Sequence, residues 1–207
     1  MRTESRLKED LARRLTEARA WTLLLAGAVP EEDLRKQHDP LMGPILWDLG
    51  HIAHFEELWL LDNLRGEIRF GEMPGMFNPF ENPRAARGKL ALPTLHATLD
   101  TLASVRARAF AALEMADLDD RARPLLTDGY VYRMVLQHEY QHGETMLQTF
   151  QLKQGEPYRA PRAAPVPPPF MDVAAGAMVC FPGGEVTIGT DDRSAAYDNE
   201  RPRHAVT

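Results

Sequence analysis

Four long segments in which apolar residues recur every three or four positions constrain the fold of this chain most strongly. The segments cover residues 5–28, 44–65, 93–116 and 129–153. Such spacing places the apolar side chains along one face of an α-helix. Glycine, proline or polar connectors bound each segment, as is typical of helix ends. The sequence therefore predicts a mainly α-helical domain, built as a four-helix bundle over residues 1–155.

A change in composition divides the chain after this helical part. Six prolines fall between residues 156 and 170, which predicts a stiff, extended linker over 156–172. Residues 178–189 then predict a strand, a glycine turn and a second strand, with Cys180 packed in the first strand. One hairpin cannot bury a core. We therefore expect residues 173–207 to be the incomplete beginning of a second domain, and the chain to be a fragment of a longer protein.

The bulk composition excludes several classes of protein. The formal net charge of −6 argues against a nucleic-acid or anionic-membrane surface. The single cysteine permits no internal disulfide, which fits a reducing cytoplasm. We find neither a signal peptide nor an apolar run long enough to span a bilayer. We expect a cytoplasmic protein without a membrane partner, and its oligomeric state stays open.

Two histidines four residues apart mark the last predicted helix. His138 and His142 fall one turn apart, so their imidazoles share a face, which we expect to point inward. Two imidazoles so placed can bind one transition-metal ion. His51, inside the apolar stripe of the second helix, is the candidate third ligand. His54 is expected on the flank of that helix. The alternative interpretation is a set of ordinary core or surface histidines.

The same segment contains a formal zinc-peptidase motif. Residues 138–142 match H-E-x-x-H, in which the glutamate, here Glu139, would be the general base. A peptidase also needs a ligand downstream, and a proline-rich stretch follows instead. Three neutral histidines suit Fe(II) with open positions or Zn(II) that activates water. The residues alone thus leave iron or zinc open, with a zinc-dependent hydrolase and a non-catalytic metal-binding bundle as alternatives.

Arginines occur in two places of interest. Arg84 and Arg87 lie three apart in an irregular segment, residues 70–92, and can form a fork for carboxylates or merely surface charge. Arg106 and Arg108 are expected on the solvent side of the third helix, and His96 is expected to be exposed.

Several separated motifs resemble those of one enzyme family. They are residues 46–52 (LWDLGHI), 56–61 (EELWLL), 80–88 (FENPRAARG) and 137–147 (QHEYQHGETML). Together they resemble the sulfoxide synthases of ergothioneine biosynthesis, also called hercynine oxygenases, over essentially the whole chain. The resemblance implies a DinB-like four-helix bundle, and an α+β domain like that of the formylglycine-generating enzyme, of which residues 173–207 are the beginning.

The resemblance also implies roles for individual residues. Non-haem Fe(II) would be held by His51, His138 and His142, and Gln141 would contact hercynine. Arg84 and Arg87 would hold the carboxylates of gamma-glutamylcysteine. The implied reaction uses O2 to join the cysteine sulfur to the hercynine imidazole and to oxidise that sulfur. The family's catalytic tyrosine is expected in the C-terminal domain, so we expect these 207 residues alone to bind metal without turnover. Close relatives use cysteine or a seleno-sugar, and Glu139 has no catalytic role in this picture.

Overall fold

The computed structural model describes residues 2–62, 64, 75–159, 177–193 and 196–207. The chain divides into two compact units, Met1–Pro161 and Arg162–Thr207. The first unit is mainly helical, as predicted, and the second contains a small sheet. Among the described residues, we find no helix with the length and apolar character needed to cross a membrane.

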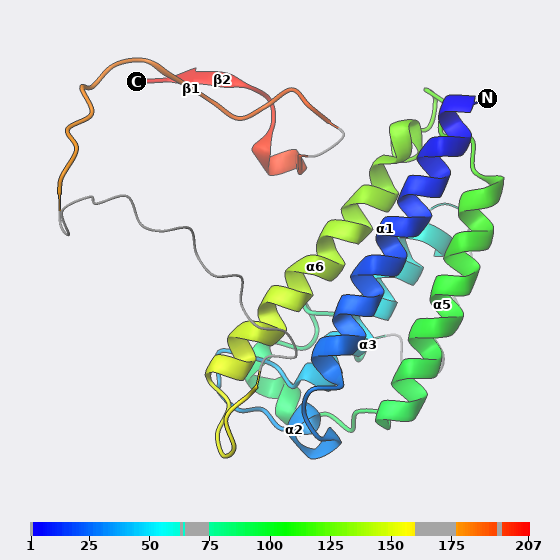
Figure 1. Ribbon diagram of the computed structural model, residues 1–207, viewed down its shortest axis with the longest axis vertical. Coiled ribbons are helices and arrows are strands. Elements are labelled where there is room, and N and C mark those ends of the chain that lie inside the picture. Colours follow the sequence, from blue (N-terminus) through cyan, green and yellow to red (C-terminus); the bar gives the residue numbers. More distant parts are fainter. Residues whose placement is uncertain (1, 63, 65–74, 160–176, 194–195) are drawn as a thin grey trace. The chain divides into compact units, whose positions relative to one another are not determined.

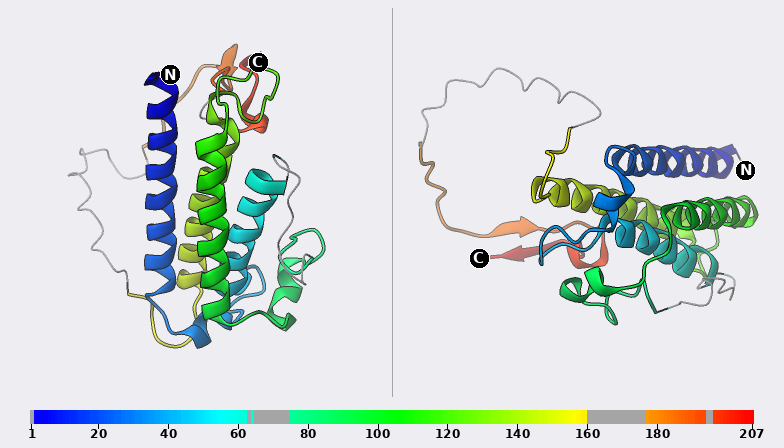
Figure 2. Two further views of the ribbon diagram at one scale, coloured as in Figure 1. Left: turned by 90° about the vertical axis from the view of Figure 1, so that its right-hand side faces the viewer. Right: turned by 90° about the horizontal axis from the view of Figure 1, so that it is seen from below.

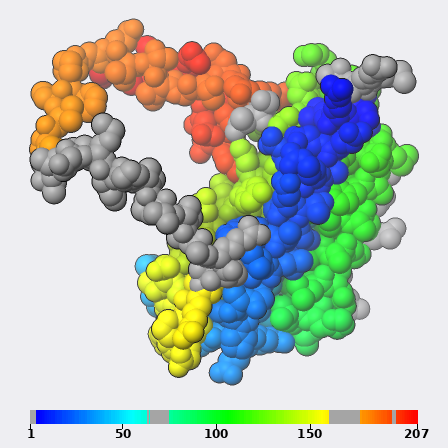
Figure 3. All heavy atoms as spheres, viewed as in Figure 1, coloured from blue at the N-terminus to red at the C-terminus, as the bar shows by residue number. Residues whose placement is uncertain are grey.

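Four long helices build the first unit. They are α1 (Arg2–Ala26), α3 (Ile45–Glu57), α5 (Leu95–Met115) and α6 (Tyr130–Gln151). Helix α3 packs on α5 and α6, and α1 packs on α6 and contacts α5. Figures 1 and 2 show the long axes of α1, α5 and α6 running alongside one another. Figure 3 shows α1, in blue, between α5 and α6 on one face. These helices lie in the four segments predicted from apolar spacing, except that α1 begins at Arg2, three residues before the predicted start.

Short helical pieces and caps complete this unit. They are α2 (Glu31–Arg35), the π-helical η1 (Leu58–Asp62), and the 3₁₀ turns η2 (Arg84–Lys89) and η3 (Thr127–Gly129). Pro44 lies at the N-cap of α3, and the Thr94 hydroxyl caps α5 by accepting the Ala97 N–H. Asp128 and Gly129 take positive φ, which turns the chain sharply into α6.

Two groups of buried apolar side chains form the core of this unit. The first lies between α1, α5 and α6 and includes Leu11, Leu15, Ala109, Val131 and Val135. The second joins the C-terminal end of α1 to α3 and α6 and includes Leu25, Ile45, Leu49, Ile52 and Met146. The second group packs the helix that carries His51 against the helix that carries the other two histidines.

A cluster of four buried charges links the four long helices, and we call it the charge quartet. It consists of Arg19, Glu56, Arg106 and Glu139, one residue from each helix. Arg19 bonds to Glu139 at 2.7 Å and to Glu56 at 2.8 Å. Arg106 bonds to Glu139 at 2.6 Å and to Glu56 at 2.5 Å. Each arginine thus contacts both carboxylates, and the set carries no net charge.

The predicted solvent exposure of two arginines was wrong. Arg106 is buried within the quartet, and Arg108 bonds to the buried Glu57 at 2.5 Å. An arginine that lies outside the apolar stripe of a helix is predicted to be exposed to solvent. This pattern does not reveal that carboxylates on other helices can satisfy the guanidinium inside the protein.

The second unit holds an antiparallel pair, β1 (Val186–Ile188) and β2 (His204–Val206), and a 3₁₀ turn, η4 (Asp198–Glu200). Val186 pairs with Val206 and Ile188 pairs with His204. The predicted hairpin was therefore wrong, because residues 178–181 form no strand and β1 pairs with a later segment. Cys180 is exposed rather than packed. Most of the predicted proline-rich linker, residues 160–172, lies outside the described residues.

Candidate metal centre

The structure brings His51 of α3 together with His138 and His142 of α6. One ring nitrogen from each histidine lies within 4.8 Å of those of the other two. His51 Nε2 and His138 Nε2 are 3.2 Å apart. The three ring centroids are separated by 4.6 to 5.0 Å. The chain therefore presents three imidazole donors to one point.

The paired histidines lie at the edge of the buried face of α6. The centre of that face is formed by Val135, Glu139, Gly143 and Met146. In the sequence, His138 directly precedes Glu139 and His142 directly precedes Gly143. His51 is buried, whereas His138 and His142 are half-buried. The expectation that the pair points fully inward was thus only partly right. This edge position leaves the histidine cluster accessible from one side.

A backbone carbonyl fixes the orientation of His51. Its Nδ1 lies 2.8 Å from the Phe77 carbonyl oxygen. A carbonyl can only accept, so Nδ1 carries the proton and Nε2 keeps its lone pair. Trp47 stacks on the His51 ring at 4.8 Å and donates its indole N–H to the Met76 carbonyl at 2.9 Å. Residues 76 and 77 are therefore tied to α3 through two adjacent carbonyls.

Gly50 makes room for this contact. A Cβ added at position 50 would lie 2.2 Å from Cε1 of Phe77, well inside van der Waals contact. The helix lacks a side chain here, so Phe77 packs directly on its backbone. The glycine of the 46–52 motif thus has a packing role next to the site.

Burial keeps two of the imidazoles neutral. Burial, and to a smaller extent the neighbouring His142, lowers the pKa of His51 to about 3, although the hydrogen bond to the Phe77 carbonyl acts in the opposite direction. Burial lowers the pKa of His138 to about 2, with the same contribution from its histidine neighbours. The Phe55 ring stacks on His138 at 3.6 Å. Neutral imidazole is the form that donates to a metal.

Two neighbouring polar residues, His54 and Glu139, do not join the cluster. His54, expected on the flank of α3, is half-buried and lies outside the group of three. Glu139 is buried in the charge quartet, where it bonds to Arg19 and Arg106. A general base must reach the water that it activates. This placement of Glu139 disfavours the zinc-peptidase interpretation.

Asp48, one turn before His51 on α3, is a site neighbour that the sequence interpretation missed. Its Oδ1 lies 3.2 Å from Nδ1 of His142, and its side chain is almost fully buried. The i, i+3 spacing from His51 was the available signal, since it places both side chains on one helix face.

Arg84 and Arg87 have different environments. The Arg87 guanidinium carbon lies 3.4 Å from the centroid of Trp47, and its Nε donates to the Asn82 carbonyl at 2.9 Å. Arg87 is buried, whereas Arg84 is exposed and donates to the Leu41 carbonyl. Gln141, between the paired histidines, is exposed. Only Arg87 is thus connected to the cluster, through the ring that stacks on His51.

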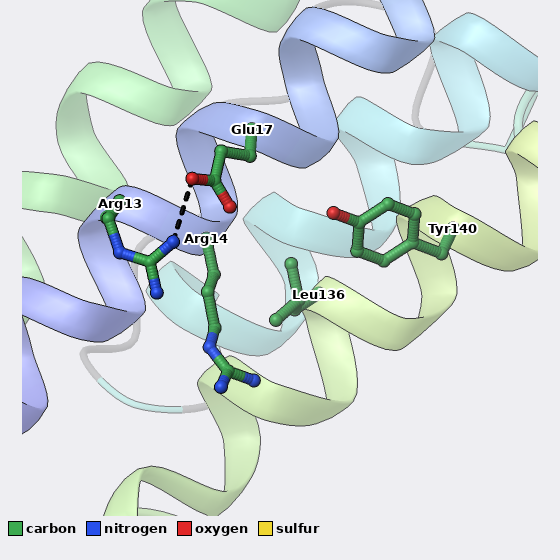
Figure 4. A pocket seen from close by; sticks show the side chains of 5 residues that line it. All are labelled: Arg13, Arg14, Glu17, Leu136 and Tyr140. Carbon is green, nitrogen blue, oxygen red and sulfur yellow. Dashed lines mark hydrogen bonds and ion pairs between the residues drawn. The ribbon is translucent and has the colours of Figure 1, made fainter.

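A separate surface pocket lies between α1 and α6. Figure 4 shows its lining residues, which are Arg13, Arg14, Glu17, Leu136 and Tyr140. Arg13 bonds to Glu17 at 2.7 Å, and Asp10 pairs with both arginines. The cations of this pocket are neutralised by neighbouring carboxylates and the three histidines do not line it, so we place no functional site there.

Comparisons with known proteins identify similar sequences. The model of the DinB superfamily matches residues 14–146. A protein named hercynine oxygenase from Mycolicibacterium thermoresistibile is 39% identical over 206 residues, covering 96% of this chain and 44% of that protein. Proteins of the same name from Mycolicibacterium smegmatis and Mycobacterium tuberculosis are 37% and 40% identical, each over 96% of this chain and 45% of the relative. The chain thus spans a little less than half the length of these relatives.

Proposed function

This chain belongs to the DinB superfamily, and we propose that it is the metal-binding part of a hercynine oxygenase, an enzyme of ergothioneine biosynthesis. The observation that carries the proposal is the convergence of His51, His138 and His142 from two helices. The sequence similarity of the chain to proteins named hercynine oxygenase supports the choice of reaction. We propose a non-haem, O2-dependent reaction that joins a thiol to hercynine and oxidises the sulfur.

The three histidines fit a transition-metal ion. Two nitrogens that bind one ion at about 2.1 Å lie roughly 3.0 to 3.4 Å apart at octahedral or tetrahedral angles. The 3.2 Å separation of His51 Nε2 and His138 Nε2 falls in this range. A set of three neutral imidazoles leaves coordination positions open and suits iron(II). We propose iron(II) as the resident metal.

The surrounding residues prepare the histidines for this role. When bound, iron(II) would supply the centre at which O2 and a thiolate react. The Phe77 carbonyl holds the Nδ1 proton of His51 and so keeps Nε2 available. The aromatic rings of Trp47 and Phe55 cover His51 and His138, which excludes water from one side of the cluster.

The substrate contacts form a second part of the proposal. We propose that Arg84 and Arg87 hold the carboxylates of gamma-glutamylcysteine and that Gln141 contacts hercynine. Arg87 lies against Trp47, which stacks on His51, and this proximity supports a substrate position near the histidines. Exposure of Arg84 and Gln141 leaves both free to meet a ligand from solvent.

The organisation of the chain follows the same proposal. Residues 1–155 form the DinB-like four-helix domain, 156–172 the proline-rich linker, and 173–207 the beginning of a formylglycine-generating-enzyme-like domain. The packing of α1, α3, α5 and α6 supports the first assignment.

Metal analysis after anaerobic purification tests the proposal. We expect about one iron per chain in the wild type, lost in His51→Ala and His138→Ala, since each removes a ligand. His96→Ala is the matched control, because His96 lies on α5 with an 87% exposed side chain, and it should keep its iron. Zinc that survives the His51 change would contradict the three-histidine iron site. If iron is found, the protein that carries this chain is assayed with hercynine, gamma-glutamylcysteine and O2, with cysteine as the competing thiol.

A further inference from the structure

Asp48 places a buried negative charge beside the histidine cluster. The residue is 1% exposed. One carboxylate oxygen, Oδ1, lies 3.2 Å from His142 Nδ1. The other, Oδ2, is buried and has no hydrogen-bond partner among the residues that the structure describes. A buried carboxylate in this condition is costly unless a cation or donors compensate it.

His142 also has a ring nitrogen whose hydrogen bonding is unsatisfied. Its Nδ1 is also buried and makes no aligned hydrogen bond within the described part of the chain, although Asp48 lies within bonding distance. Buried donors and acceptors are rarely left without partners. Oδ1 of Asp48 and Nδ1 of His142 lie 3.2 Å apart, so a small rotation of the imidazole would let Nδ1 donate to Oδ1. Oδ2 of Asp48 would still have no hydrogen-bond partner among the described residues.

Arg87 compensates the charge of Asp48 only in part. Burial lowers the pKa of the Arg87 guanidinium, while the negative charge of Asp48 acts in the opposite direction. Arg87 itself directs Nε to the Asn82 carbonyl and lies flat over Trp47. Asp48 contacts His142, one of the three histidines that converge, so a metal ion held by these histidines would place a compensating positive charge near Asp48.

We propose that Asp48 is a positioning residue for the metal centre, a role that rests on the metal site proposed above. Its Oδ1 accepts the Nδ1 proton of His142, which leaves Nε2 of that ring for the metal. Its charge also offsets one of the two positive charges of a divalent ion, which three neutral imidazoles leave uncompensated. His51 is held in the same way by a neutral carbonyl, so Asp48 adds charge as well as orientation.

Binding of cobalt(II), measured by competition with a chromophoric chelator, tests this role. Asp48→Ala should weaken binding by about 10- to 100-fold, the usual effect of losing the partner of a metal-bound histidine. Asp48→Asn keeps an oxygen that can accept the proton and should lose less. Both variants should still bind one ion per chain. Asp100→Asn, a change at a 67% exposed position on α5, is the matched control and should bind as the wild type does.

Unfolding of the metal-free proteins separates positioning from a structural role. Asp48→Asn removes an uncompensated buried charge, so the metal-free variant should be at least as stable as the wild type, while cobalt should stabilise it less. Loss of stability in the metal-free variant, or affinity of Asp48→Ala within about threefold of wild type, far below the loss expected, would overturn the proposal. If the wild type binds cobalt and His51→Ala does not, either of these results contradicts only the role of Asp48. If the wild type binds no cobalt, the metal centre itself fails, and the role of Asp48 with it.

Discussion

Removal of Glu139 should destabilise the protein severely while leaving the three candidate metal ligands in place. In the charge quartet Glu139 bonds to Arg19 at 2.7 Å and to Arg106 at 2.6 Å. Glu139→Ala leaves two guanidinium groups facing one carboxylate, Glu56, in a buried site. Breaking a buried ion pair from one side costs about 3 to 5 kcal/mol. This is a large part of the 5 to 15 kcal/mol typical of a domain.

Urea unfolding of the metal-free protein measures this loss. With a slope of about 1 to 3 kcal/mol per molar urea, the midpoint should fall by roughly 1 M or more. Glu139→Gln keeps an acceptor oxygen and should cost less. Glu144→Gln on the exposed side of α6 is the control and should change the unfolding free energy by no more than about 0.5 kcal/mol.

A double variant tests the pairing itself. Glu139→Leu combined with Arg106→Leu should lose less free energy than the sum of the single changes, because the second change removes the charge that the first left unpaired. If Glu139→Ala lowers the unfolding free energy by less than about 1 kcal/mol, our account of the quartet is wrong. A Glu139 that faced a metal-bound water would show this small effect, and the hydrolase interpretation would regain support.

Three further predictions follow from the site and the second unit. Gly50→Ala should destabilise the protein by about 1 to 3 kcal/mol in urea unfolding, because its Cβ would overlap Phe77; a penalty unchanged in a Phe77→Ala background would contradict this. The lowered pKa values of His51 and His138 mean that the unfolded chain binds more protons below its imidazole pKa of about 6.5. The unfolding free energy of the metal-free protein should therefore fall as pH falls from about 6.5 toward 4, by up to about 1.4 kcal/mol per pH unit for each histidine. A double variant, His51→Phe with His138→Phe, that keeps the same pH dependence would refute this prediction. The exposed Cys180 should react with a thiol reagent in native buffer as fast as in urea, and protection in native buffer would count against its placement.

Apolar periodicity predicted the helical part of the fold because burial of one helix face is encoded in side-chain type. The histidine cluster was also accessible from sequence, since the spacing of His138 and His142 fixes their relative direction on α6. The carbonyl that orients His51 could not be predicted in this way, because every residue has a carbonyl and Phe77 gives no signal of its own. The buried position of Arg106 depended on carboxylates from two other helices, which no local pattern reveals.

The strand pairing failed for a related reason. Alternation along residues 178–189 suggested that neighbouring segments pair, yet β1 pairs with residues 204–206. Apolar residues at every second position indicate that a segment is extended, but they do not identify the strand that pairs with it.

The separation of 87 positions between His51 and His138 also sets the order of events during synthesis. At about 5 to 20 residues per second, His51 leaves the ribosome roughly 4 to 17 s before His138. During that interval the nascent chain offers a free metal ion only one of its three imidazole donors. Even the finished α6 offers only two until α3 packs against it. We therefore expect the proposed metal site to acquire its ion late, after α3 and α6 have packed against one another.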